Sequence, residues 1–249
     1  MNRPALALVL TLAAAPPARS APESFEAEQR SFPRVRAAFA SKEPRLRAAF
    51  ERAGAPFPPR GILLRAFKRE AILELWAQGR GERYVRVEQY PICASSGGLG
   101  PKRREGDGQV PEGFYRVSHF NPASRFHLSL GIDYPNPADR RSASGRLGGS
   151  IYIHGSCVTI GCLPITDDRI EEVYVAAVLA RAAGQAAIPV HVFPTALTED
   201  ALAGLLRTHA RSPELAAFWR NLAEGYARFE RDHRPPQVLI DGAGRYLFQ

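Results

Sequence analysis

The amino-acid sequence predicts an α+β protein, with a mainly β central segment flanked by helical extensions at both ends. Residues 61–193 contain short runs rich in β-branched and aromatic residues, separated by turns that contain Gly. One stretch within this segment instead has apolar residues at helical spacing, as do residues 21–60 and 194–249. We therefore expect four segments along the chain: 1–20, 21–60, 61–193 and 194–249.

Residues 1–20 have the features of a secretory signal peptide. Arg3 supplies a positive charge, an apolar run covers residues 5–15, and Ala18-Arg19-Ser20 fits a cleavage site. The apolar run is too short to remain in a bilayer as an anchor. We therefore expect an exported, periplasmic protein with no transmembrane span in the mature chain.

Residues 21–60 predict a polar linker followed by a helical segment. Residues 21–30 are mostly polar, and apolar residues between Val35 and Phe50 then have helical spacing. Pro44 is expected to interrupt this helix, because proline removes a backbone hydrogen bond inside a helix. A proline cluster at residues 56–59 ends the segment.

The central segment, residues 61–193, is expected to contain seven strands and one helix. The first two strands should form a hairpin around Lys68-Arg69-Glu70. The helix should begin at Asp167-Asp168, since carboxylates stabilise a helix N-terminus, and end near Gly184. The expected strands cover residues 62–67, 71–76, 84–90, 114–117, 126–130, 150–154 and 190–193.

The C-terminal extension, residues 194–249, is expected to contain two helices and a short hairpin. The helices should cover residues 201–207 and 214–229, with Pro213 at the start of the second. The hairpin should cover residues 237–248 and turn at Asp241-Gly242.

The charge of the chain limits its partners. The formal net charge is +8, and the two Arg of the expected signal would leave with it. A basic protein suits an anionic partner such as a cell-wall polymer, a membrane surface or nucleic acid. No run of Arg and Lys with interleaved aromatic residues occurs, so we expect no nucleic-acid partner.

His154 and Cys162 form the strongest candidate site. They lie on one short segment between an expected strand and the expected helix. A thiol attacks carbonyl carbon as its thiolate, and a neighbouring imidazole can take the thiol proton. Taken singly, each residue also fits a structural role, Cys162 as a small buried apolar residue and His154 as a core histidine.

Other patterns point to alternatives that remain open or weak. His154, Cys157 and Cys162 could supply three zinc ligands, but their spacing matches no common zinc pattern and no fourth ligand is evident. We therefore expect no metal or other cofactor. Residues 95–102 resemble a phosphate-binding loop only superficially, because Pro101 precedes Lys102 and Arg103 follows it.

The chain has three cysteines, so at least one thiol has no partner within it. In an exported protein a retained free thiol suggests catalysis. Cys93 and Cys157 could form a disulfide, or both could be buried thiols.

Several motifs in order resemble the L,D-transpeptidase (YkuD-type) catalytic domain, and most closely its YafK-like branch. The resemblance covers about residues 61–193 and extends into the helical tail. Its residues are 92–102, Glu105-Gly106-Asp107-Gly108, Pro111-Glu112-Gly113-Phe114-Tyr115, Asp133-Tyr134-Pro135-Asn136, Asp139, Ile153-His154-Gly155, Gly161-Cys162, 218–222 and Gly225-Tyr226.

The resemblance implies a mainly β catalytic domain that acts on peptidoglycan stem peptides. Cys162 matches the family nucleophile, and His154-Gly155 matches the family His-Gly pair. The thiolate would attack the carbonyl on the L-centre of meso-diaminopimelate and form a thioester. Backbone N–H groups around Gly161 and Cys162 would stabilise the oxyanion, with Gly155 and Thr159 as further substrate-binding residues.

Three departures from the usual family pattern bear on the reaction. The gap between His154-Gly155 and Cys162 is short, Ile160 stands where a second His is usual, and Pro164 replaces Arg or Asn. These departures match the YafK-like branch, which the resemblance associates with release of an outer-membrane lipoprotein from peptidoglycan. The first alternative to transpeptidation is therefore a hydrolase that releases this lipoprotein. A non-catalytic wall-binding module and a metal-dependent hydrolase are separate hypotheses.

Overall fold

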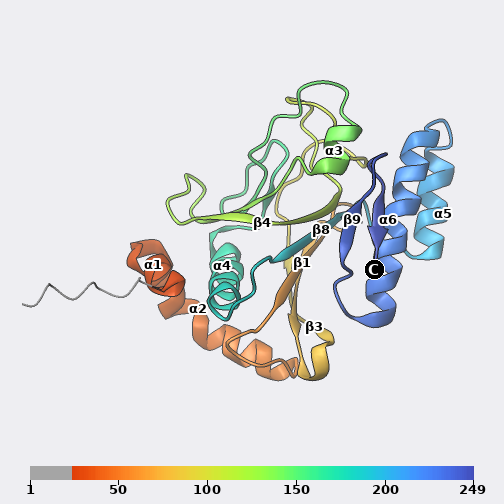
Figure 1. Cartoon of the computed structure of the whole chain (residues 1–249). Helices are drawn as coiled ribbons and strands as arrows, with labels where there is room; N and C mark the ends of the chain where they lie inside the picture. Colours follow the sequence, from red (N-terminus) through yellow and green to blue (C-terminus); the bar gives the residue numbers. More distant parts are fainter. Residues whose placement is uncertain (1–23) are drawn as a thin grey trace, which may run out of the picture.

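The computed structural model describes residues 24–249, and its centre is an eight-stranded sheet (Figure 1). The strand order is β3-β2-β1-β8-β4-β5-β6-β7, and only the β1–β8 and β6–β7 pairs are parallel. The fold is mainly β at its centre and α+β overall, as the sequence predicts. The strands are β1 (Ile62–Phe67), β2 (Ile72–Gln78), β3 (Tyr84–Pro91), β4 (Gly113–Asn121), β5 (Ser129–Ile132), β6 (Tyr152–His154), β7 (Leu163–Pro164) and β8 (Pro189–Phe193).

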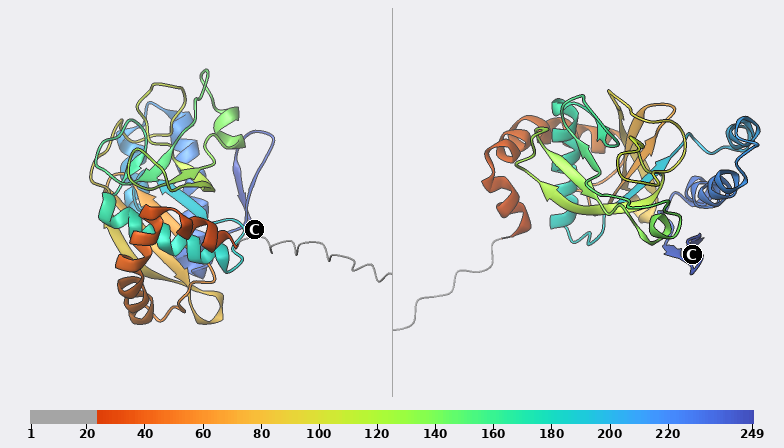
Figure 2. Two further views of the ribbon diagram at one scale, coloured as in Figure 1. Left: turned by 90° about the vertical axis from the view of Figure 1, so that its left-hand side faces the viewer. Right: turned by 90° about the horizontal axis from the view of Figure 1, so that it is seen from above.

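Helices cover both faces of the sheet, which explains why every residue of β1 is buried. Leu64 and Ala66 belong to a large core with α1 (Phe25–Ser31), α2 (Pro33–Arg52) and α4 (Asp167–Ala182). Figures 1 and 2 show α5 (Glu199–Thr208) and α6 (Pro213–Asp232) on the other side of the sheet. Phe67, in β1, joins the second core on that side.

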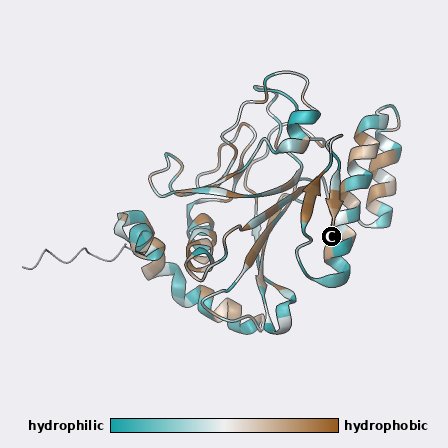
Figure 3. Cartoon of the chain, viewed as in Figure 1, coloured by the Kyte–Doolittle hydropathy of each residue, from teal (hydrophilic) through white to brown (hydrophobic). Residues whose placement is uncertain are grey.

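Helix α4 is the helix expected after Cys162. Asp167 and Asp168 lie in its first turn, and Gly184 follows its C-cap residue in a left-handed conformation with φ of +101°. All residues from Val173 to Ala180 are buried, because α4 lies between the sheet and the two N-terminal helices. Figure 3 shows much of α4 in the brown that marks hydrophobic residues, as expected for a buried helix.

The C-terminal extension packs on the sheet through aromatic side chains. Trp219 and Tyr226 of α6 belong to one buried cluster with Phe67, Phe114 and Phe193 of the sheet. The expected hairpin forms from β9 (Val238–Ile240) and β10 (Tyr246–Phe248), and Tyr246 joins the same cluster.

The N-terminal helices differ from the prediction. Residues 25–31 of the expected linker form α1, and the hydroxyl of Ser24 caps it by accepting a hydrogen bond from the N–H of Ala27. Pro44 does not interrupt α2, which continues through it. Pro44 is exposed while the opposite face is buried, so packing of that face outweighs one lost hydrogen bond.

The strand predicted for residues 126–130 is wrong at its start. The strand β5 begins at Ser129, and Phe126 and His127 lie in the preceding turn. His127 has φ of +67°, a left-handed conformation that a strand cannot contain. The short helices α3 (Pro137–Arg141) and η1 (Arg80–Glu82), and the two-residue strand β7, were not predicted.

The predicted signal peptide lies outside the described residues. Among residues 24–249, no helix combines the length and the apolar character that crossing a bilayer requires.

Candidate active site

Strand pairing brings His154 and Cys162 to the same edge of the sheet, at its two neighbouring strands β6 and β7. His154 is the last residue of β6, and Cys162 directly precedes β7. These two strands run parallel, with Ile153 opposite Leu163 and His154 opposite Pro164. Because the strands are parallel, segment 155–162 must run back along β6 before β7 begins. Cys162 therefore lies beside β6, the strand that carries His154.

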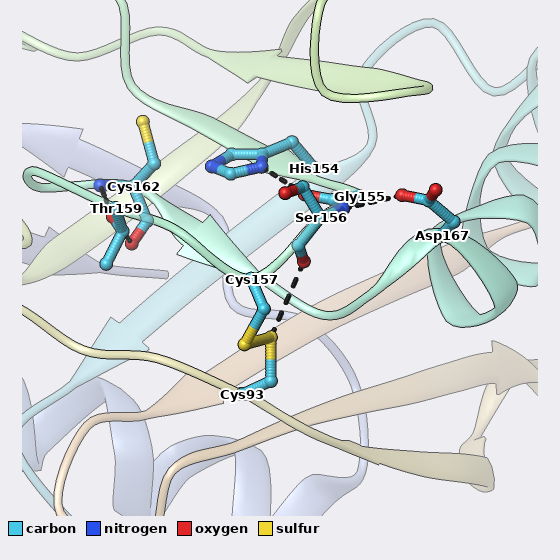
Figure 4. The surroundings of a disulfide bond; sticks show 8 residues. All are labelled: Cys93, His154, Gly155, Ser156, Cys157, Thr159, Cys162 and Asp167. Atoms are coloured by element: carbon cyan, nitrogen blue, oxygen red, sulfur yellow. Dashed lines mark hydrogen bonds between the residues drawn. A yellow bond between two sulfur atoms is a disulfide. The ribbon is translucent and has the colours of Figure 1, made fainter.

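The His154 ring is held by its neighbours in a defined orientation. Its Nδ1 lies 2.5 Å from the carbonyl oxygen of Gly155, and its ring lies 4.7 Å from that of Phe126. Since a carbonyl only accepts hydrogen bonds, Nδ1 carries the proton and Nε2 keeps a lone pair. Figure 4 shows this second nitrogen directed toward the Cys162 side of the site. Burial lowers the pKa of His154, so the ring is neutral at neutral pH.

Cys162 is a partly buried thiol that is protonated at rest. Its Sγ donates to the carbonyl oxygen of Ser150 at 3.6 Å, and no hydrogen bond joins it to the His154 ring. Burial raises the pKa of the thiol, against smaller opposing effects of a hydrogen bond from the Tyr152 backbone and of the Lys102 charge. The resting pair is therefore a neutral thiol beside a neutral base rather than a thiolate–imidazolium pair.

The backbone around Cys162 is fixed by two hydroxyl groups. The Thr159 hydroxyl accepts from the Cys162 N–H at 2.8 Å and donates to the Cys162 carbonyl at 2.9 Å. The Gly161 N–H donates to the Ser96 hydroxyl at 2.7 Å. Both N–H groups expected to face an oxyanion are thus paired with protein hydroxyls in the resting site.

Gly155 and Gly161 are required by close backbone approach. A Cβ at Gly155 would lie 2.5 Å from Asp167 Oδ1 and 2.7 Å from the Phe126 carbonyl oxygen. Gly161 has φ of +98°, and a Cβ there would lie 2.9 Å from the Gln109 carbonyl oxygen. Both glycines therefore let the loop pack tightly against neighbouring segments.

A disulfide joins Cys93 to Cys157 and decides the question that the sequence left open. The two Cα atoms are 5.6 Å apart, and the residues are 64 positions apart in the chain. The bond connects the segment after β3 to the loop between His154 and Cys162. Figure 4 shows the Cys162 thiol pointing away from this disulfide.

A pocket of about 260 Å³ opens beside Cys162. The segment that resembles a phosphate loop forms one wall of it, and no helix follows that segment. Other lining residues are mostly apolar, so the pocket suits a chain with a carbon skeleton. They are Lys68, Arg69, Ile92, Ala94, Val110 and Leu163.

Lys68, which lines this pocket, forms a buried ion pair with Glu112, and no local pattern in the sequence indicated this pairing. Lys68 Nζ donates to Glu112 at 2.9 Å and to the carbonyls of Gly100 and Val110 at 2.8 and 3.0 Å. Burial lowers the pKa of Lys68, against the opposing effect of Glu112. Glu112 also accepts from the Gly100 N–H at 2.7 Å and from Trp219 Nε1 at 2.8 Å.

The rarity of lysine in this chain is the feature of the sequence that could have drawn attention to Lys68 and Lys102. Only three lysines occur in a chain with 33 basic residues, and Lys68 and Lys102 are both buried near the pocket. Lys102 pairs with Asp107 at 2.6 Å, and Asp107 also accepts three backbone N–H groups. These contacts lower the pKa of Asp107 to about 2 despite its partial burial.

No metal-binding cluster accompanies the thiol within the described part of the chain. Residues 24–249 contain no group of three or more His, Cys, Asp or Glu side chains arranged to hold an ion. Of the zinc ligands considered from the sequence, Cys157 is bonded to Cys93 instead.

Comparison with known proteins identifies the fold that carries this site. The family model of the L,D-transpeptidase catalytic domain (YkuD) matches residues 65–192. The chain belongs to the L,D-transpeptidase family. The Escherichia coli (strain K12) protein named "Putative L,D-transpeptidase YafK" is 37% identical over 188 residues, which cover 75% of this chain and 73% of that protein.

Two solved structures are also similar to this L,D-transpeptidase-family chain. The helical cell shape determining protein Pgp2 from Campylobacter jejuni has a TM-score of 0.45 at 16% identity, covering 81% of this chain and 80% of its own. Bd1075 from Bdellovibrio bacteriovorus has a TM-score of 0.41 at 17% identity, covering 74% and 78% respectively. The L,D-transpeptidase match ends at residue 192, so Trp219 lies outside it although it bonds to Glu112.

Proposed function

We propose that the protein is an exported, cysteine-dependent acyltransferase that acts on peptidoglycan stem peptides in the periplasm. Its substrate carbonyl would be the one on the L-centre of meso-diaminopimelate. The observation that carries this proposal is the placement of Cys162, the free cysteine of the described chain, at a pocket beside the strand that ends at His154. Membership of the L,D-transpeptidase family supports the reaction class.

His154 would act as the general base that activates Cys162. Its Nε2 lone pair takes the thiol proton while Sγ bonds to the carbonyl carbon. The resulting imidazolium returns this proton to the amine nitrogen as the C–N bond breaks, which leaves a thioester on Cys162. An acceptor amine then attacks the thioester and loses a proton to His154. The C–S bond breaks as the new amide forms, and the imidazolium returns the proton to the Cys162 thiolate, so that the free enzyme is regenerated.

The loop residues would bind and orient the reacting carbonyl. The Gly161 N–H is the candidate donor to the oxyanion, and it would exchange its Ser96 partner for the substrate oxygen. Thr159 would hold the backbone of Cys162 in position during the attack, since its hydroxyl bonds to both the N–H and the carbonyl of that residue. Gly155 would keep the His154 loop close to the start of α4.

A hydrolase is the second candidate, in which water replaces the acceptor amine. Ile160 favours it, because this side chain beside the nucleophile is 83% exposed and offers no polar group to an incoming amine. The thioester would then end as a carboxylate, and a lipoprotein bound to peptidoglycan could be the released group.

Mass spectrometry of defined muropeptides separates these outcomes. Tetrapeptide and lipoprotein-linked muropeptides are incubated with the protein, and the products are scored as new cross-links or as released carboxylates. Cys162→Ala should reduce either activity at least a thousandfold, whereas Cys162→Ala with full activity would disprove the mechanism. Binding to sacculi without turnover would favour a wall-binding module. The mass of the N-terminus in a periplasmic fraction tests export.

A further inference from the structure

A groove of about 1080 Å³ lies on the C-terminal side of the pocket beside Cys162. It lies between α6 and the segment 99–109, and the turn between β9 and β10 contributes to it. Leu99 lines both the groove and the pocket that contains Cys162. A chain that fills the pocket can therefore continue into the groove past Leu99.

The groove contains more positive than negative side chains. Arg103, Arg211, Arg220 and Arg245 line it, together with Glu214 and Glu224. Arg245 lies 3.6 Å from Glu224, which neutralises both charges. Within residues 24–249, no carboxylate lies within ion-pair distance of the other three arginines. Their guanidinium groups are therefore available to an anionic ligand.

The walls of the groove are held in place without a ligand. Trp219 fixes α6 to Glu112, and the amide of Asn221 exchanges two hydrogen bonds with the backbone of Tyr246, at 2.9 and 2.8 Å. The guanidinium carbon of Arg103 lies 5.1 Å from the centre of the Phe218 ring. A preformed site loses less entropy when it binds a ligand.

We propose that this groove binds the free carboxylates of the stem peptide whose carbonyl Cys162 attacks. The inference rests on the proposed function and adds a binding subsite to it. An extended peptide covers about 3.3 Å per residue, so two or three residues beyond the pocket reach into a groove of this size. Carboxylates suit the unpaired arginines, and the apolar side chains of Leu215 and Phe218 suit the carbon atoms between them.

Binding is measured directly, on protein that cannot turn over. The probe is a fluorescein-labelled tetrapeptide, L-Ala-γ-D-Glu-meso-diaminopimelate-D-Ala, and fluorescence anisotropy on Cys162→Ala protein gives its Kd. The test variant adds Arg211→Gln and Arg220→Gln. The control variant adds Arg52→Gln and Arg80→Gln, two exposed arginines away from the groove, and so removes the same charge.

We expect the groove variant to weaken binding about tenfold, as the loss of charge-assisted hydrogen bonds would do, and the control to change it less than twofold. A probe with amidated carboxylates should bind the Cys162→Ala protein and the groove variant equally weakly. Equal Kd values for the groove and control variants, or no measurable binding of the acidic probe, would overturn the proposal. Failure of the proposed function would look different. The Cys162→Ala protein would then still turn over substrate, while the groove variant would still bind the probe more weakly than the control.

Discussion

The indole N–H of Trp219 donates to the Glu112 carboxylate across 107 positions of the chain, at a distance of 2.8 Å. Glu112 is fully buried and also holds Lys68 and the N–H of Gly100, both beside the catalytic pocket. Helix α6, which lies beyond the family match, is thereby connected to the wall of the candidate active site.

Trp219→Phe tests this connection. The substitution removes the donor and leaves one buried carboxylate oxygen without a partner, so the free energy of unfolding should fall by about 1–3 kcal/mol. The pocket wall should also become less well positioned, so kcat/KM on a muropeptide substrate should fall. Urea unfolding and steady-state kinetics measure the two effects.

Trp76→Phe is the matched control. The Trp76 indole also donates to a buried carboxylate, that of Glu74, at 2.7 Å. It lies in β2, which contributes no residue to the catalytic pocket. This variant should lose comparable stability and retain its kcat/KM. Equal kinetic losses in the two variants would show that Trp219 acts through general stability alone.

Gly161→Ala should impair both folding and activity. The added Cβ would lie 2.9 Å from the Gln109 carbonyl oxygen, and φ of +98° is strained for alanine. Such strain costs about 1–3 kcal/mol. Gly98→Ala, in the pocket beside Cys162, is the control, because its Cβ would meet no atom within 4 Å. Thermal unfolding and muropeptide turnover should separate the two variants, and identical behaviour would refute the steric argument.

The pH dependence of kcat/KM should show that His154 is already deprotonated, and so able to act as a base, below neutral pH. Burial lowers the pKa of His154, so kcat/KM should rise as the pH passes through a value below that of an ordinary histidine and then stay level near neutrality. Burial raises the pKa of Cys162, so alkylation by iodoacetamide should remain slow at neutral pH and accelerate only in alkaline solution.

His154→Gln should lower kcat/KM by about 10²–10⁴-fold and remove the acidic limb of this profile. Fast alkylation of Cys162 at pH 6 would instead show a resting thiolate and contradict the neutral pair.

Loss of the disulfide should destabilise the protein while sparing the nucleophile. The bond closes a loop over 64 positions, for which chain entropy predicts about 4 kcal/mol of stability. The double variant Cys93→Ala/Cys157→Ala should unfold at correspondingly lower urea. In wild-type protein denatured without reductant, thiol titration should find one reactive cysteine, and three after reduction. Three before reduction would show that the bond is absent.

Local patterns were sufficient to predict most elements of the fold. The hairpin of β1 and β2, helix α4 and the C-terminal helices all have patterns that their packing reinforces. The errors fall where tertiary contacts outweigh local preference. A buried face carries α2 through Pro44, and the left-handed backbone of His127 delays β5 until Ser129.

The site was predictable only in part, for a related reason. His154 and Cys162 are neighbours in sequence, so one short segment indicated both of them. Their roles remain predictions. Lys68 and Ser96 line the pocket and make long-range hydrogen bonds to Glu112 and Gly161, which no local pattern records.

The buried guanidinium group of Arg65 affects whether the C-terminal extension can be removed from the protein. Arg65 of β1 is almost fully buried, among aromatic rings that include Phe67 and Phe229, and its close ion-pair partner is Glu230 of α6, at 2.8 Å. A chain shortened at residue 193 would keep this charge and lose that partner, and it would expose Phe193 to water. The last two helices are therefore part of the same folding unit as the sheet, and a protein engineered without them would be expected to aggregate.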